Sequence, residues 1–492
     1  MWTTRRSSSR WWENGRRGRA SRHASFPGIT REWRERLFSR RKGPAPTSRS
    51  TCCHSPGASS PACGSTAGRT TGPWPERFWK SMEDGLRVML LVLDGLADVS
   101  HPGLGWRTPL QAAETPTLDR LAREGCCALM YPLAPGVCPS SEIAHWSIFG
   151  YRPEEFPGRA YLHALDAGLP CRDGDALFMF NLVPVVEREG RVFVSGGSGL
   201  DMAEVCSRKE ALLRKCAPPG MELFYMGEIE FIAIVRGGSA KVASTDPFLH
   251  RRPVGEIRAV EGWEEETGTA RSVDALRRFV SSAERALADE SGPGGIRLGL
   301  IMKWTSRAAR VMSFEERHGM KAAAVVSTPC FRGMGELLSM RVHNVARSGA
   351  GEDMEEKLSS AERLLEEGHE LVFVHTKHPD EAAHTGDPRA KVSVIEELDG
   401  ALSRAEDLLG REDLLTVITC DHSTPTTDDP RLIHGGDPVP VLFHGVTVRR
   451  DGLDAFDEVR AAGGGMGQLS GSDLMPLVLY LSRRAPFFTG TP

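Results

Sequence analysis

Short runs of apolar residues recur along this chain, and charged or polar residues follow them directly. The runs are continuously apolar rather than alternating, which is typical of strands covered on both faces. Helical patterns separate the runs, and this alternation predicts an α/β fold with a mostly parallel sheet flanked by helices. We expect strands at 88–93, 370–374, 414–419 and 439–443, and helices at 117–124, 352–367, 391–409 and 473–481.

Three of the predicted strands are followed by side chains suited to metal binding or proton transfer, namely Asp94, His375 and Asp421. Open α/β sheets bind ligands in the crevice beyond the carboxyl ends of their strands. We therefore expect these side chains to meet at one edge of the sheet. Nearby segments add residues of the same chemical kind and one hydroxyl: Asp380, His384, His422, His434 and Ser141.

The spacing of these residues suits a pair of divalent cations. Asp380 and His384 are four positions apart, so one helical turn or a tight loop presents both to the same ion. Asp421 and His422 are adjacent, so their side chains diverge, which suits either bridging two neighbouring ions or binding one ion from two sides. Carboxylate and imidazole groups suit Mn²⁺, Mg²⁺ or Zn²⁺. Two ions about 4 Å apart can clamp the attacking and leaving oxygens of a displacement, so the pattern indicates phosphoryl transfer to a serine.

Each motif taken alone also has a purely structural explanation. An isolated Asp-His pair is more often a capping or surface pair than a metal site. Ser141 also fits a helix N-cap, because Ser-Ser-Glu precedes Ile-Ala-His-Trp. Both interpretations of Ser141 hold together, since a helix N-terminus helps to anchor phosphate. Ser140 is the rival nucleophile, and the order of five segments, mostly at strand ends, favours the functional interpretation.

Longer motifs follow one another along the chain and carry a family resemblance: Asp94-Gly-Leu-Ala-Asp98, Ala134-Pro-Gly-Val-Cys-Pro-Ser-Ser141, Phe149-Gly-Tyr-Arg-Pro, Pro157-Gly-Arg159, Asp380-Glu-Ala-Ala-His384, Asp421-His-Ser-Thr-Pro425 and His434-Gly-Gly-Asp-Pro-Val-Pro. With these motifs the chain resembles the archaeal-type, cofactor-independent (2,3-bisphosphoglycerate-independent) phosphoglycerate mutases of the alkaline phosphatase superfamily. The resemblance runs from about Arg87 to Leu481, roughly four fifths of the chain.

The resemblance implies a complete set of metal ligands. One ion is expected on Asp380, His384 and His434. The second is expected on Asp94, Asp421 and His422, with Ser141 completing its shell. Mn²⁺ is the favoured ion, and Mg²⁺, Co²⁺ or Zn²⁺ also fit.

The resemblance also implies an activity with two in-line steps. Ser141 takes the phosphoryl group of 3-phosphoglycerate, and the bound glycerate then accepts it on its 2-hydroxyl to give 2-phosphoglycerate. Lys377 and Arg159 match family positions, and with Arg307 they are the predicted substrate-binding residues. Arg251 and Arg252 are further cationic candidates. A solvated or ion-paired surface role is the alternative for each of these side chains.

Three segments depart from the family pattern on the expected substrate side: Glu142 in place of Asp, 161–163, and 299–307, which lacks a Pro-Ala-Asn sequence. These departures keep a second hypothesis open, a metal-dependent phosphohydrolase of the same superfamily acting on another small phosphorylated molecule. A non-catalytic binding protein is a third hypothesis, which an incomplete ligand set would favour, and every expected ligand is present.

Changes in sequence pattern along the chain predict its domain organisation. Residues 165–310 have alternating strand patterns between Gly- and Pro-rich turns, and we expect an inserted α+β cap there. The expected metal-binding catalytic domain comprises 83–164 and 311–492. The sequence leaves the oligomeric state open.

Residues 1–81 differ from the rest in composition. They hold 17 of the 61 Lys and Arg but 4 of the 65 Asp and Glu, together with six of the ten Trp. A segment of this kind buries too little apolar surface to fold, so 1–82 is expected to be a disordered basic tail. A nucleic-acid-binding arm and a transit peptide are two interpretations. The favoured one is translation from Met82, and the acidic remainder argues against nucleic acid as a partner.

Cysteine usage and hydropathy bear on the compartment. Eleven Cys are scattered without a Cys-x-x-Cys pair, which argues against zinc knuckles and redox motifs and favours reduced thiols. No stretch approaches the ~20 apolar residues of a membrane span. We expect a cytoplasmic protein that acts on a small phosphorylated substrate, without a membrane partner.

Overall fold

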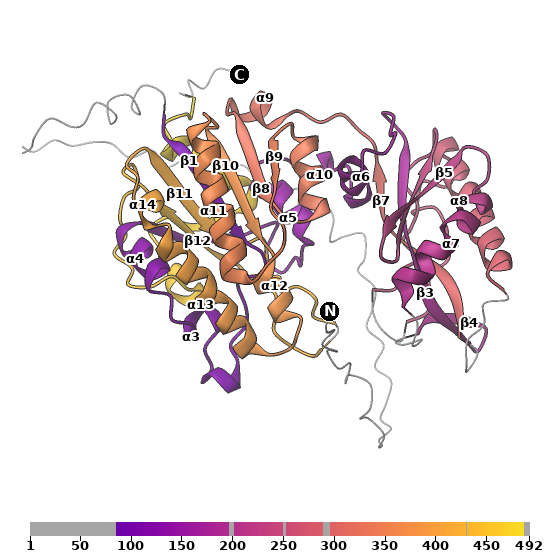
Figure 1. The fold of residues 1–492 in the computed structure, drawn as a ribbon, viewed down its shortest axis with the longest axis horizontal. Coiled ribbons are helices and arrows are strands. Elements are labelled where there is room, and N and C mark those ends of the chain that lie inside the picture. The colour runs from indigo at the N-terminus through magenta and orange to yellow at the C-terminus, as the bar shows by residue number, and fades with distance from the viewer. Residues whose placement is uncertain (1–84, 196–200, 249–251, 289–295, 430, 487–492) are drawn as a thin grey trace, which may run out of the picture. The chain divides into compact units, whose positions relative to one another are not determined.

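The computed structural model describes residues 85–195, 201–248, 252–288, 296–429 and 431–486. These residues contain a large mostly parallel sheet and a smaller antiparallel sheet (Figure 1). The predicted basic tail and Arg251 lie outside the described residues. None of the described helices is both long and apolar enough to cross a membrane.

The large sheet has the strand order β13-β2-β12-β11-β1-β10-β8-β9. Every neighbouring pair in it is parallel except the two pairs that β12 makes with β11 and β2. The strands are β1 (Arg87–Leu93), β2 (Cys126–Tyr131), β8 (Ala322–Val326), β9 (Arg341–Asn344), β10 (Leu371–Thr376), β11 (Leu414–Thr419), β12 (Val439–His444) and β13 (Gly467–Ser470).

The four strands predicted from apolar runs are β1, β10, β11 and β12, so the fold class is confirmed. One of the four, β12, runs antiparallel to both of its neighbours, so the sheet is mostly and not wholly parallel. Five of the six β12 residues are buried, and a strand covered on both faces is apolar whichever way it runs. An apolar run therefore indicates burial and does not encode direction.

Helices cover the large sheet, and Figure 1 shows α11 (Ala350–Glu366) and α13 (Pro388–Arg404) crossing in front of it. The helix predicted at 391–409 is interrupted at Ala405, after which α14 (Glu406–Leu409) begins. The remaining helices on this part of the chain are α3 (Pro109–Ala112), α4 (Pro116–Glu124), α5 (Ser141–Ile148), α6 (Arg159–Asp166), α9 (Phe314–His318), α10 (Pro329–Leu337), α12 (His378–Ala383), α15 (Glu458–Ala461) and α16 (Gly471–Leu481), with short 3-10 turns at Pro102–Leu104 and Pro153–Glu155.

The smaller sheet lies within the segment that we predicted as an insertion. It consists of β3 (Ala176–Arg188), β4 (Arg191–Val194), β5 (Met221–Gly227), β6 (Glu230–Val235) and β7 (Arg297–Arg307). Its pairings are all antiparallel, and α7 (Met202–Cys216) and α8 (Thr267–Ala286) share an apolar cluster with it. The insertion boundaries at 165 and 310 remain a prediction.

The central strands are held by burial on both faces. Six consecutive side chains of β1, from Val88 to Leu93, are at most 1% exposed. Each fully buried aliphatic side chain of this size contributes about 1.5–3 kcal/mol to folding. Such a core fixes the strand register, and the register determines where the residues beyond the strand ends lie.

Candidate active site

Strand register brings the predicted site residues to one edge of the large sheet. Val92 of β1 is aligned with His375 of β10 on one side and with Thr419 of β11 on the other. The chain segments that leave these three strands therefore emerge together, with the Asp94 amide donating to the Thr376 carbonyl across 2.9 Å. This is the crevice that the sequence predicts.

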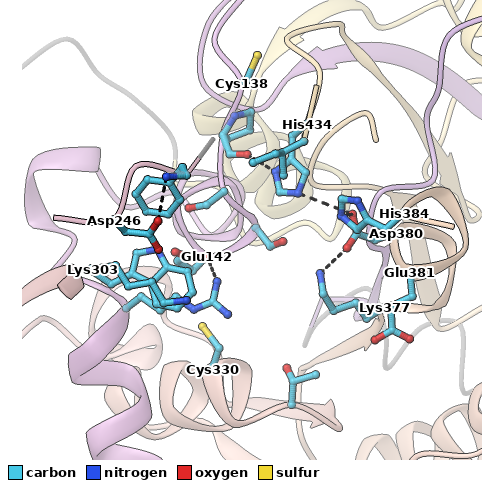
Figure 2. A pocket seen from close by; sticks show the side chains of 18 of the residues that line it. Cys138, Glu142, Asp246, Lys303, Cys330, Lys377, Asp380, Glu381, His384 and His434 are labelled. Carbon is cyan, nitrogen blue, oxygen red and sulfur yellow. Dashed lines mark hydrogen bonds and ion pairs between the residues drawn. The ribbon is translucent and has the colours of Figure 1, made fainter. Parts of the chain in front are cut away.

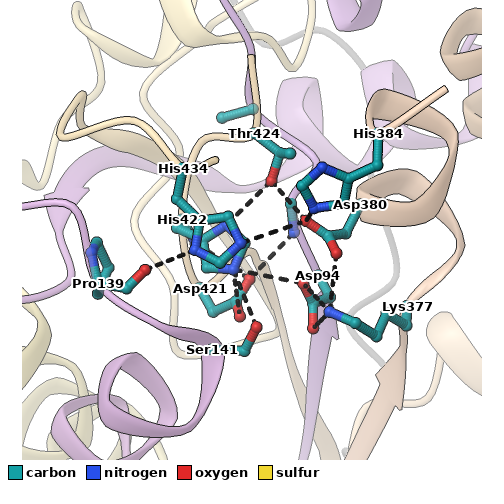
Figure 3. Close-up of polar contacts among 12 residues, drawn as sticks. Asp94, Pro139, Ser141, Lys377, Asp380, His384, Asp421, His422, Thr424 and His434 are labelled. Atoms are coloured by element: carbon teal, nitrogen blue, oxygen red, sulfur yellow. Dashed lines mark hydrogen bonds and ion pairs between the residues drawn. The ribbon is translucent and has the colours of Figure 1, made fainter. Parts of the chain in front are cut away.

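The first ligand group consists of Asp94, Asp421 and His422, which are fully buried (Figure 3). One ligand atom from each lies within 4.8 Å of the others. His422 Nε2 is 3.2 Å from Asp421 Oδ2 and 3.5 Å from Asp94 Oδ1. Three donors that converge at such distances form one side of a coordination shell.

The second ligand group consists of Asp380, His384 and His434, again with ligand atoms within 4.8 Å of one another. Asp380 lies on α12 and His384 caps that helix, so the predicted helical turn places the His384 ring 3.3 Å from Asp380 Oδ1. His434 Nε2 is 3.7 Å from the same oxygen. His434 donates from Nδ1 to the Pro139 carbonyl at 2.6 Å, which leaves its Nε2 free for a ligand.

Thr424 connects the two groups and fixes the His422 tautomer. Its hydroxyl donates to Asp380 Oδ1 at 2.8 Å, so His422 Nδ1, 3.0 Å away, must donate to the Thr424 oxygen. The His422 Nε2 atom therefore carries a lone pair. Burial lowers the pKa of His422 to about 3, so the ring is neutral. A lone pair that faces two carboxylates is favourable when a cation lies between them, which supports the fit of this group to a divalent ion.

The excess of negative charge in the crevice also supports the binding of divalent ions. Three carboxylates, from Asp94, Asp380 and Asp421, converge around the single ammonium of Lys377, which is 3.2 Å from Asp94 and 2.8 Å from Asp380. Burial and the neighbouring Asp94 raise the pKa of Asp421 well above its ordinary value. Within the described part of the chain, Asp421 Oδ2 has no hydrogen-bond partner. These residues fit divalent cations, which would supply the missing positive charge.

Ser141 lies beside the first ligand group. It is the first residue of α5, and Ser140 takes the N-cap position without a side-chain capping bond. The Ser141 hydroxyl is 3.0 Å from the His422 Nε2 lone pair. Ser141 is therefore not the N-cap that the sequence suggests as an alternative, but it lies at a helix N-terminus with direct access to the ligand group.

Two of the three predicted substrate-binding residues lie at the candidate site, and the third does not. Lys377 is held between Asp94 and Asp380, and Arg159 begins α6 with its guanidinium 3.5 Å from Glu142. Both line a cavity of about 1010 Å³ that also contains Ser141 (Figure 2). Arg252 lines the same cavity. Arg307 is exposed at the end of β7 and is not among the lining residues, so the structure does not bring it to this site.

Comparisons with known proteins place this geometry in a family. The sequence profile of the metalloenzyme superfamily matches residues 86–480. The chain is 32% identical over 421 residues to the 2,3-bisphosphoglycerate-independent phosphoglycerate mutase 2 of Methanocaldococcus jannaschii, covering 81% of this chain and 94% of that protein. It is 33% identical over 426 residues to the corresponding mutase of Methanopyrus kandleri, covering 82% and 98%.

Solved structures agree with these relatives. A Pyrococcus horikoshii protein superposes with a TM-score of 0.66 at 26% identity, covering 82% of this chain and 99% of that one. The cofactor-independent phosphoglycerate mutase of Thermoplasma acidophilum superposes with a TM-score of 0.56 at 25% identity, covering 81% and 100%. The chain belongs to the 2,3-bisphosphoglycerate-independent phosphoglycerate mutase family.

All three departures from the mutase pattern supply residues that line the cavity: Glu142, His163 and Trp304. Two of them meet at one side chain, because Arg159 contacts both the Glu142 carboxylate and the Trp304 ring. Trp304 has a φ of 49°, a left-handed conformation that costs a non-glycine residue about 1–3 kcal/mol. Two of the three departures therefore lie against the same side chain of the cavity wall, and His163 lines the same cavity.

Sequence reasoning missed two residues that support the mutase ligands. Thr424 bridges the groups, and its signal was its place two positions after His422. His145 lies one helical turn after Ser141, donates from Nδ1 to the Ser141 carbonyl at 2.7 Å, and is 3.5 Å from Asp421 Oδ2. Burial lowers the pKa of His145 well below its ordinary value, so this ring stays neutral beside Ser141.

Proposed function

We propose that this protein interconverts 3-phosphoglycerate and 2-phosphoglycerate through a phosphoserine at Ser141, without 2,3-bisphosphoglycerate. The observation that carries the proposal is the position of the Ser141 hydroxyl, 3.0 Å from a ligand of one metal group, at the wall of a cavity of about 1010 Å³. The membership of the chain in the mutase family supports the choice of substrate.

Two divalent cations complete the proposed site. Asp94, Asp421 and His422, together with Ser141, would hold one ion, and the group of Asp380, His384 and His434 would hold the other. When bound, the ions lower the pKa of the serine hydroxyl and neutralise charge on the transferring group. Mn²⁺ is the proposed ion, and Mg²⁺, Co²⁺ and Zn²⁺ suit the same oxygen and nitrogen donors.

In the first step Ser141 gives up its proton and its Oγ attacks the phosphorus of 3-phosphoglycerate. The Oγ–P bond forms, the bond from phosphorus to the 3-oxygen breaks, and that oxygen takes up a proton to leave glycerate. In the second step the 2-hydroxyl of glycerate loses its proton and its oxygen attacks the phosphorus of the phosphoserine. The bond from phosphorus to the 2-oxygen forms, the Oγ–P bond breaks, and Oγ takes up a proton, which restores the Ser141 hydroxyl and gives 2-phosphoglycerate. The Lys377 ammonium, 2.8 Å from Asp380, lies where it can balance the negative charge that builds up on the phosphoryl oxygens.

A mutase must keep glycerate in and water out between the two steps, because water would turn the phosphoserine into free phosphate. Residues from the smaller-sheet segment line the cavity beside those of the catalytic crevice, among them Asp246, Phe248 and Trp304. This arrangement supports retention of glycerate. The eight cysteines of the described residues are free thiols, which supports the proposed cytoplasmic location.

The proposal is tested by incubating the purified protein with 3-phosphoglycerate and Mn²⁺, without 2,3-bisphosphoglycerate, and measuring 2-phosphoglycerate and free phosphate separately. We expect 2-phosphoglycerate to form with almost no free phosphate. Release of free phosphate as the main product would contradict the mutase and indicate a phosphohydrolase on the same residues.

A further inference from the structure

The cavity wall formed by α6 and β7 carries an aromatic ring between two cations. The Arg159 guanidinium carbon lies 3.9 Å from the centroid of the Trp304 ring, and the Lys303 ammonium lies 3.9 Å from the same ring. All three residues line the cavity. Such distances are well within the range of cation–π attraction, so the ring holds both cations in place.

A β-bulge makes this arrangement possible. Consecutive residues of a regular strand point to opposite faces, so Lys303 and Trp304 would ordinarily be separated by the sheet. The pairing of β7 with β3 shifts here: Lys303 is opposite Met179 and Ser306 is opposite Leu177, so two β7 residues face Phe178 alone. With its φ of 49°, Trp304 turns toward the same cavity as Lys303. Bulges beside active sites commonly re-aim a side chain in this way.

The other cations of the cavity are largely occupied by carboxylates. Six Arg and Lys residues line it. Besides Arg159, which is 3.5 Å from Glu142, three of them form ion pairs with described acidic residues: Lys377 with Asp94 and Asp380, Arg347 with Glu381, and Arg431 with Asp429. Lys303 forms no ion pair within the described part of the chain. Its Nζ can donate to the Asn181 amide oxygen at 3.1 Å. The carboxylates of Glu230 and Asp246 act on the Lys303 ammonium only from beyond ion-pair distance, so this cation can still pair with a ligand.

Arg159 also keeps hydrogen-bonding capacity. Its contact with Glu142 is 3.5 Å long, and among the described residues its buried Nε has no hydrogen-bond partner. The Glu142 side chain is only 4% exposed, and its Oε2 likewise accepts no hydrogen bond. The buried Nε2 of His163, which lines the same cavity, is a third unpartnered atom. Unpartnered buried polar atoms at a cavity wall indicate a position for a polar ligand.

We propose that Trp304 is a positioning residue that presents Arg159 and Lys303 as a pair to the carboxylate of the substrate. The inference rests on the proposed function and names the residues that hold the end of 3-phosphoglycerate that is not transferred. Figure 2 shows Lys303 on one side of the cavity and Lys377, Asp380 and His384 on the other. The phosphoryl group belongs with the ligand groups and Ser141, so the second anionic group of the substrate is left to face Arg159 and Lys303.

The test compares two ligands that differ only at the end opposite the phosphoryl group. 3-Phosphoglycerate has a carboxylate where glycerol 3-phosphate has a hydroxymethyl group. Their dissociation constants are measured by calorimetry with Mn²⁺ present, in full-length Ser141→Ala protein so that no turnover occurs. The variants are Trp304→Leu, Trp304→Phe and Lys303→Met. The matched control is Trp263→Leu, because Trp263 also has a lysine over its ring (Lys241, 4.9 Å) but does not line the cavity.

We expect Trp304→Leu and Lys303→Met to weaken 3-phosphoglycerate binding about tenfold, as for the loss of a charged hydrogen bond. Binding of glycerol 3-phosphate should change by less than about twofold. Trp304→Phe keeps an aromatic face, so its dissociation constant for 3-phosphoglycerate should lie between those of these two variants and that of the control. Equal weakening of both ligands, or unchanged binding of 3-phosphoglycerate in variants that melt at the wild-type temperature, would overturn the inference.

Kinetics separates this inference from the proposed function. In the active protein, Trp304→Leu should raise KM for 3-phosphoglycerate about tenfold and change kcat by less than about threefold, because the lost contact is uniform along the reaction. A wild-type protein that binds both ligands as expected but makes no 2-phosphoglycerate would contradict the mutase and support the carboxylate site. An active wild type with an unaffected Trp304→Leu variant would support the mutase and overturn the carboxylate site.

Discussion

His375 donates from Nε2 to Asp94 Oδ2 across 3.0 Å, between two neighbouring parallel strands of the large sheet. The sequence places His375 among the ligand-type residues, and the structure places it behind a ligand. Burial lowers the pKa of His375, although the hydrogen bond with Asp94 opposes the shift, so the ring is a neutral donor. This hydrogen bond restrains the Asp94 carboxylate, so we infer that His375 orients Asp94 toward Asp421 and His422.

Replacing His375 should therefore weaken the first metal group without removing a ligand. We expect His375→Ala to lower activity about 10–100-fold at limiting Mn²⁺, with partial recovery at high Mn²⁺. His375→Gln can still donate a hydrogen bond to Asp94, so it should lose less activity than His375→Ala. The measurement is kcat/KM as a function of Mn²⁺ concentration. An equal loss in both variants at every Mn²⁺ concentration would contradict a positioning role.

The two ligand groups predict a metal stoichiometry of two per chain. Asp421→Asn and His434→Gln each alter a different group, so each should bind one ion in elemental analysis after dialysis. Asp437→Asn is a matched control, because Asp437 lies near His434 in sequence but belongs to neither group, and it should keep two ions. Full stoichiometry in both ligand variants would contradict the assignment.

Removal of metal should also lower the melting temperature, since the three carboxylates then repel one another in the crevice. A ligand at 100 times its dissociation constant stabilises the folded state by about 2.7 kcal/mol. Chelation followed by Mn²⁺ addition, monitored by thermal unfolding, measures this effect. No recovery of the melting temperature on adding Mn²⁺ would count against binding by the folded protein.

Helix α6, which carries Arg159, is positioned by close packing against α10. A methyl group at Gly333 of α10 would overlap the Leu162 carbonyl oxygen of α6. We expect Gly333→Ala to lower the free energy of unfolding by about 3 kcal/mol, because backbone atoms have no room to yield. Gly400→Ala is the control. The added methyl group in α13 would approach only Arg404, so stability should rise by about 0.5–1 kcal/mol. Denaturant titration measures both changes.

Glu458 predicts a pH dependence of stability that is separate from the metal site. It accepts hydrogen bonds from the Asp98 amide at 3.0 Å and from the Thr108 hydroxyl at 2.7 Å. Burial nevertheless raises the pKa of Glu458 from 4.5 to about 7. The folded state therefore binds a proton that the unfolded state has lost. The stability that this proton contributes is fully present below about pH 4.5 and is lost as pH rises to about 7.

Glu458→Gln mimics the protonated form and should remove this dependence. The wild type should be less stable than Glu458→Gln above pH 7, by about 3 kcal/mol, and the difference should fall toward zero near pH 4.5. Free energies of unfolding across this range provide the test. A difference that does not change with pH would show that Glu458 titrates alike in both states.

The sequence predicted those parts of the site that depend on local patterns. Asp94 and Asp421 follow apolar runs, and an apolar run fixes both a buried strand and the point where it ends. The spacing of Asp380 and His384 likewise encodes one helical turn, which α12 provides. These features need no knowledge of distant contacts, so a single sequence contains them.

Features that depend on long-range pairing were not predictable in this way. The antiparallel direction of β12 is set by its neighbours β11 and β2 and leaves no trace in its apolar run. Long-range pairing also explains why Trp304 lines the cavity, whereas Arg307, the residue that we predicted from the sequence, does not. A bulge in the pairing of β7 with β3 decides which residues of β7 face the cavity, and a shift of one residue reverses the faces of a strand. Arg307 was predicted to bind the substrate only because its side chain is cationic.

The phosphoserine is the most direct test of the central claim. The protein is mixed with 3-phosphoglycerate and Mn²⁺, quenched in acid within the first turnovers, digested and analysed by mass spectrometry. We predict phosphate on Ser141 in the wild type and in Ser140→Ala, and none in Ser141→Ala. Phosphate on Ser140, or 2-phosphoglycerate formed by Ser141→Ala at the wild-type rate, would contradict the assignment of Ser141 as the nucleophile.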